Sequence, residues 1–80
     1  MSTKKLSNIP LKDFRKFLKN VGLERVKTGR GRGGHEKWIR NDLRRPVTIQ
    51  THIDPVPVFI VRQILRNLNI SRKEFFEYLD

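Results

Sequence analysis

The chain has 80 residues, with 18 Lys and Arg against 8 Asp and Glu, so its formal net charge at neutral pH is +10. A chain of this length forms one small domain, residues 1–80, and is too short for a dinucleotide-binding sheet or a multidomain enzyme. The absence of cysteine excludes a disulfide scaffold and a thiolate zinc site, and it fits a reducing compartment.

The longest apolar run is Val58–Val61, far shorter than the roughly 20 residues that a membrane span needs. The N-terminal segment has lysines but no apolar stretch of the kind found in secretory signals. We therefore expect a cytoplasmic protein without membrane association.

The whole excess of positive charge lies in residues 1–45, because residues 46–80 contain as many acidic as basic side chains. Solubility alone does not need such an uneven distribution. The pattern favours a face that binds a polyanion such as a nucleic acid.

A first helix is predicted over residues 10–21, with Pro10 in its first turn and Gly22 ending it in the left-handed conformation. Apolar residues at helical spacing form its buried face: Leu11, Phe14, Phe17, Leu18 and Val21. A basic stripe at the same spacing lies on another face: Lys12, Arg15, Lys16 and Lys19.

Short strands are predicted over residues 23–27, 35–40 and 46–51, because apolar and polar residues alternate there. Short connections favour an antiparallel meander. Val47 and Ile49 share one face of the third strand. Trp38 is expected to be a core residue, with stacking on a nucleic-acid base as the alternative.

A second helix is predicted over residues 57–68, with Asn69 ending it in the left-handed conformation. Its inner stripe comprises Val58, Val61, Leu65 and Leu68, broadened by Ile60 and Ile64. Ser71 and Glu74 form a capping box that starts a short third helix. The order α-β-β-β-α predicts an α+β domain: a three-stranded antiparallel sheet covered by helices on one face, plus a short C-terminal helix.

The segment TGRGRGG, residues 28–34, suits phosphate binding, since glycine permits close approach and the Arg30 and Arg32 guanidinium groups match phosphate oxygens. It is not a P-loop, because no Gly-Lys-Ser/Thr follows. A solvated glycine-rich hairpin is an equally good interpretation.

His35 follows this segment at the start of a predicted strand. A histidine beside arginines can shuttle protons while a ribose 2′-hydroxyl attacks its own phosphodiester. Arg30, Arg32 and Lys37 would hold the scissile phosphate, and the basic stripe of the first helix would hold the flanking backbone. A surface histidine without a catalytic role is the alternative.

His52 is the only other histidine. It is interpreted as a second proton-transfer group, a substrate contact or a structural residue, with the last two favoured. Together with His35 and Asp54 it matches no standard zinc spacing, so no metal or other cofactor is expected.

Several segments, in order along most of the chain, resemble the HicA toxins of bacterial toxin–antitoxin systems. They are GHEKW at 34–38, RPVTI at 45–49, His52, PVFIVRQIL at 57–65 and ISRKEF at 70–75. The resemblance implies a fold like the double-stranded RNA-binding domain. It also implies an endoribonuclease (mRNA interferase) that inhibits translation and is masked by a HicB-type antitoxin.

In that family the catalytic histidine follows a glycine-serine pair at the start of the second strand, which places the role on His35. Gly34 stands where the family usually has serine. This departure removes a hydroxyl that orients the substrate or the histidine.

Two other functions compete with an RNA endonuclease. A non-catalytic double-stranded RNA-binding module is the main alternative, although the second long helix begins without the lysine cluster such modules use. A DNA-binding regulator is disfavoured, because the helix after Asn69 is acidic and offers no recognition face.

Overall fold

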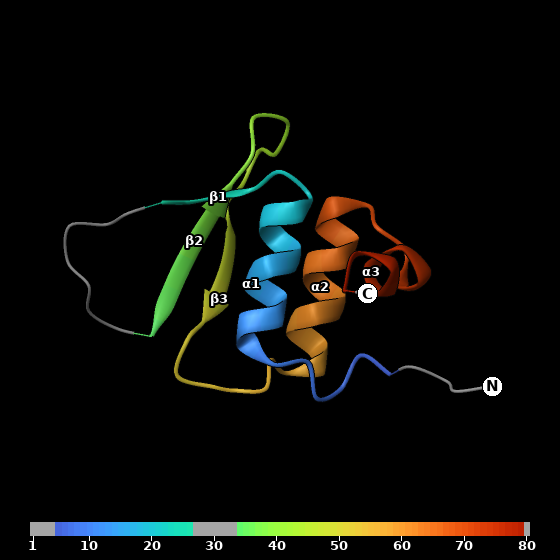
Figure 1. Cartoon of the computed structure of the whole chain (residues 1–80). Coiled ribbons are helices and arrows are strands. Elements are labelled where there is room, and N and C mark those ends of the chain that lie inside the picture. Colours follow the sequence, from blue (N-terminus) through green and yellow to red (C-terminus); the bar gives the residue numbers. More distant parts are fainter. Residues whose placement is uncertain (1–4, 27–33, 80) are drawn as a thin grey trace.

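The computed structural model describes residues 5–26 and 34–79. Its elements are α1 (Leu11–Asn20), β1 (Glu24–Val26), β2 (His35–Ile39), β3 (Val47–Gln50), α2 (Val58–Leu68) and α3 (Arg72–Leu79). The strands form one antiparallel sheet in the order β1-β2-β3. The helices α1 and α2 run side by side next to it (Figure 1), and α3 packs against α1, where Phe75 contacts Phe14 and Phe17. The predicted fold class is confirmed.

The end of α1 follows from its sequence. Gly22 has φ of 92°, and its N–H donates to the carbonyl of Lys19 at 3.0 Å. The N–H of Leu23 reaches back to the carbonyl of Leu18, also at 3.0 Å. This pair of bonds closes the helix around a left-handed residue, for which glycine has no steric penalty. The predicted role of Gly22 is confirmed.

The core lies between the helices and the sheet. Its most completely buried side chains come from five elements: Phe14, Phe17 and Leu18 of α1, Trp38 of β2, Ile49 of β3, Val61 of α2 and Phe75 of α3. On α2 the inner stripe is shifted from the predicted one. Ile64 is buried, whereas Val58 at the first turn is only half-buried.

Local sequence signals also determine where the helices of the C-terminal region end and begin. Asn69 is left-handed, with φ of 57°, as predicted. The Ser71 hydroxyl accepts the N–H of Glu74 at 3.1 Å, and the Glu74 carboxylate accepts the N–H of Ser71 at 3.0 Å. This reciprocal capping box fixes the start of α3, and the Phe75 side chain of that helix is buried in the core.

None of the helices in the described part of the chain is both long enough and apolar enough to cross a membrane.

Candidate functional site

His35 is the first residue of β2, and its side chain is exposed. The antiparallel register pairs it with Gln50 and pairs Lys37 with Thr48. Side chains alternate along a strand, and Trp38 on the same strand is buried against the helices. His35 and Lys37 therefore lie together on the open face of the sheet.

Glu36 points the other way and joins three elements. Its carboxylate accepts hydrogen bonds from Nη2 of Arg15 at 2.7 Å, Nε of Arg15 at 3.2 Å and Nε1 of Trp38 at 3.2 Å. Nη1 of Arg25 lies 3.3 Å from it. The Glu36 side chain is only 12% exposed. This one carboxylate thus connects α1 to both β1 and β2.

Two effects on the pKa of Glu36 oppose each other. Burial by itself raises that pKa, because it disfavours the charged form. The hydrogen bonds from Arg15 and Trp38, and the charges of Arg15 and Arg25, outweigh burial and leave the pKa lower than usual. The carboxylate is therefore ionised in the folded protein over the whole neutral range.

Glu36, Arg15, Arg25 and Trp38 form a cluster, here called the Glu36 cluster, which bears on two interpretations of the sequence. The Arg15 guanidinium, one of the four groups in the predicted basic stripe, is bound to Glu36 in a bidentate pair. The Trp38 ring is only 1% exposed, so it is a core residue and the base-stacking alternative is wrong. The sequence does not indicate a role for Glu36, since its partner Arg15 is 21 residues away in the chain.

We expect the substitution Glu36→Gln to lower the free energy of unfolding at pH 7 by about 1–2 kcal/mol, because it removes a charged acceptor from partly exposed partners. Since folding lowers the pKa of Glu36, its contribution is complete above the ordinary value of about 4.5 and is lost as the pH falls below it. Urea unfolding of both proteins from pH 3 to pH 7 checks this. A constant difference across that range contradicts it.

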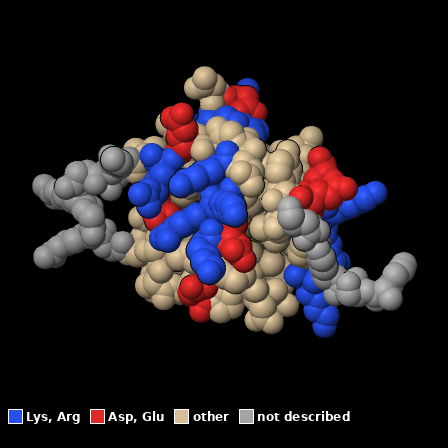
Figure 2. Space-filling model, in the orientation of Figure 1, with Lys and Arg blue, Asp and Glu red and all other residues tan. Residues whose placement is uncertain are grey.

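The remaining members of the stripe, Lys12, Lys16 and Lys19, are exposed on α1. Figure 2 shows a dense group of basic side chains in the centre of the molecule, in the region that α1 occupies in Figure 1. Figure 1 also shows that α1 begins at the end of the molecule where β2 begins and β3 ends. The first lysine of the stripe is therefore the one nearest the His35 end. Arg30 and Arg32 lie outside the described residues.

His52 lies close to His35. Their ring centroids are 6.4 Å apart with an interplanar angle of 75°, and both side chains are exposed. The sequence did not predict this proximity, because it depends on the register that brings the end of β3 beside the start of β2.

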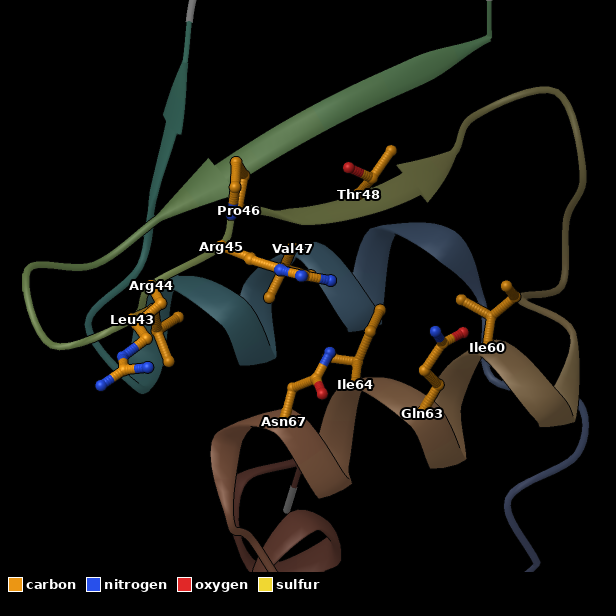
Figure 3. A pocket seen from close by; sticks show the side chains of 10 residues that line it. All are labelled: Leu43, Arg44, Arg45, Pro46, Val47, Thr48, Ile60, Gln63, Ile64 and Asn67. Atoms are coloured by element: carbon orange, nitrogen blue, oxygen red, sulfur yellow. The ribbon is translucent and has the colours of Figure 1, made fainter.

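A separate groove of about 540 Å³ lies between the start of β3 and α2 (Figure 3). Ile60 and Ile64 of α2 face it from one side, and Arg44 and Arg45 precede β3 on the other. Those two arginines are the only ionisable side chains among its lining residues. The groove thus offers no group that titrates near neutrality and is not a candidate for proton transfer.

Within residues 5–26 and 34–79, no three His, Cys, Asp or Glu side chains come together in a way that could hold a metal ion. On the open face of the sheet, the imidazole of His35 is suited to proton transfer and the ammonium group of Lys37 to binding an anion.

A family model described as the HicA toxin of bacterial toxin–antitoxin systems matches residues 11–70, from the start of α1 to the residue that follows Asn69. No curated protein and no solved structure gave a significant match.

Proposed function

The chain belongs to the HicA toxin family, and from this premise we propose that it is an endoribonuclease that cleaves mRNA without a metal ion, with His35 in proton transfer. The observation that supports this is the exposed His35 at the rim of the sheet, beside Lys37, on a chain with a net charge of +10. The coarser role, a toxin of a toxin–antitoxin system, follows from the family itself.

The proposed reaction uses the ribose of the substrate as nucleophile. The 2′-hydroxyl loses its proton and attacks the adjacent phosphorus, and the bond from phosphorus to the 5′-oxygen breaks as that oxygen gains a proton. The products end in a 2′,3′-cyclic phosphate and a 5′-hydroxyl. An imidazole suits these transfers because it takes and gives protons near neutral pH. The Lys37 ammonium, on the same face of β2, stabilises the charge on the phosphoryl oxygens.

Substrate binding is electrostatic in this proposal. Lys12, Lys16 and Lys19 on α1 hold backbone phosphates away from the cleaved bond, and Arg30 and Arg32, which precede Gly34 in the sequence, add further phosphate contacts. We assign Arg15 to positioning rather than to phosphate binding, because its guanidinium is paired with Glu36. Binding of RNA should therefore weaken steeply with salt.

The test is incubation of the purified protein with a defined RNA and with DNA of the same sequence. We expect cleavage of RNA only, fragments ending in a 2′,3′-cyclic phosphate, and an undiminished rate in EDTA, because only imidazole and ribose groups move protons. Intact RNA after incubation with a folded, RNA-binding protein contradicts the endonuclease assignment. Loss of cleavage in EDTA contradicts the metal-independent mechanism.

A HicB-type antitoxin is the proposed protein partner, since the family functions in toxin–antitoxin pairs. An acidic antitoxin surface that covers the basic face blocks RNA and neutralises charge at once. Association should accordingly be tight at low salt and weaker at high salt.

The alternative of a non-catalytic double-stranded RNA-binding module finds less support. The first turn of α2 carries Val58, Phe59 and Ile60 in place of lysines, and the Phe59 side chain is 70% exposed. An apolar side chain at that place offers nothing to duplex phosphates.

A further inference from the structure

We infer that His52 is the second proton-transfer residue of this site, so that His35 and His52 act as an acid–base pair on one phosphodiester. This inference rests on the proposed function. It starts from the 6.4 Å between the two ring centroids and from the exposure of both side chains. They are also the only two histidines of the chain.

Hydrogen bonds to neighbouring elements fix the chain on both sides of His52. Before it, the N–H of Thr51 donates to the carbonyl of Gly34 at 2.5 Å, which ties the residue preceding His52 to the residue preceding His35. After it, the Asp54 carboxylate accepts the N–H of Leu11 at 3.0 Å, at the first residue of α1. These bonds hold the backbone segment that carries His52 beside the rim of the sheet.

Gly34 provides the space for that imidazole. A Cβ atom added at this position would lie 2.9 Å from Cγ of His52 and would overlap its Nδ1. Gly34 does not have a positive φ, unlike Gly22. Glycine is therefore needed at residue 34 for the position of His52 and not for the backbone conformation.

The separation of the rings matches the geometry of the reaction. In an in-line displacement the attacking 2′-oxygen and the leaving 5′-oxygen lie on opposite sides of the phosphorus. One imidazole takes the proton of the 2′-hydroxyl, and the other, as imidazolium, gives a proton to the 5′-oxygen. The two rings lie edge to face with centroids 6.4 Å apart and are both open to solvent, so a single phosphodiester that approaches from solvent is within reach of both imidazoles.

The nearby carboxylates already accept hydrogen bonds from groups outside the site. Glu36 points to the helix side of the sheet, where Arg15 and Trp38 bind it. Asp54 accepts the N–H of Leu11. Among the described residues around His35, His52 is thus the group best placed for the second proton.

The test compares two RNA substrates, one natural and one with sulfur in place of the 5′-oxygen at the cleaved bond. A thiolate leaves without being protonated, so this substrate removes the need for the general acid. We expect His52→Ala and His35→Ala each to slow cleavage of natural RNA by about 100-fold or more. The sulfur substrate should restore the rate of one of the two variants, whichever lacks the acid, and not of the other.

Ile53→Ala is the matched control, because Ile53 is the exposed neighbour of His52 on the same segment. It should cleave like the parent protein. A rate for His52→Ala within threefold of the parent overturns the role of His52 and leaves that of His35 intact. Rescue of neither slow variant by sulfur overturns the acid–base pair. A parent protein that cleaves neither substrate refutes the proposed function itself.

Gly34→Ala tests the placement of the imidazole independently. It should reduce cleavage about as much as His52→Ala, because the new methyl group displaces the ring. In a protein that already carries His52→Ala, Gly34→Ala should lower the rate of cleavage little further, since the two changes remove the same interaction. Equal losses in both backgrounds would show that Gly34 acts independently of His52 and would overturn this part of the inference.

Discussion

Replacing His35 with alanine should lower the rate of RNA cleavage by about 10²–10⁴-fold and abolish growth arrest when the protein is expressed. The effect is large because, in the proposed reaction, the substitution removes a proton-transfer group. It should not be an effect on folding, because the His35 side chain is exposed and makes no contribution to the core. Single-turnover cleavage of a defined RNA and growth after induction measure the two results.

The matched control is Ile39→Ala, at the other end of β2 on the same face of the sheet and 46% exposed. It should retain both cleavage and growth arrest. If the His35→Ala protein arrests growth and degrades mRNA like its parent, His35 is not catalytic.

Replacing Phe75 with alanine should lower the free energy of unfolding by about 3–5 kcal/mol. Its ring is fully buried and packs edge-on against Phe17, with centroids 4.7 Å apart, and its centroid lies 6.1 Å from that of Phe14. The domain has a small core, and total stabilities of about 5–15 kcal/mol are typical. The expected loss is therefore a large fraction of the total free energy of unfolding.

Urea denaturation followed by the fluorescence of the single tryptophan, Trp38, measures this change. Phe59→Ala is the control, since the Phe59 side chain is 70% exposed, and it should alter stability by less than about 0.5 kcal/mol. Equal unfolding midpoints for Phe75→Ala and the parent contradict the packing. The expected result also means that α3 is part of the folding unit, although the family match ends at residue 70.

The elements were predictable where their signals are local. Gly22 and Leu23 close the end of α1 through bonds to residues three and five positions earlier, respectively, and Ser71 and Glu74 cap α3 within one turn. Apolar periodicity likewise identified the buried faces of α1 and β3, except that Val21, predicted to be a buried helix residue, lies just past the end of α1 and is half-buried. It was less successful at the first turn of α2, where Val58 was predicted to belong to the inner stripe but is only half-buried.

The contacts that build the site were not predictable, because they join residues distant in the chain. Arg15 and Glu36 are 21 residues apart, and Leu11 and Asp54 are 43 apart. A helical stripe shows which side chains share a face, but it does not show that one of them is paired with a carboxylate of the sheet. The sequence placed His35 at a strand end and raised a role for His52. Only the strand register brings the two rings together.

The Glu36 cluster has a mechanical consequence. One carboxylate joins the helix that bears Lys12, Lys16 and Lys19 to the strand that bears His35. In the proposed function, these lysines bind RNA and the histidine cleaves it, so the Arg15–Glu36 pair couples the position of the binding residues to that of the cleaving residue. We then expect the cleaved bond to lie at a fixed distance along the RNA from the phosphates that α1 holds.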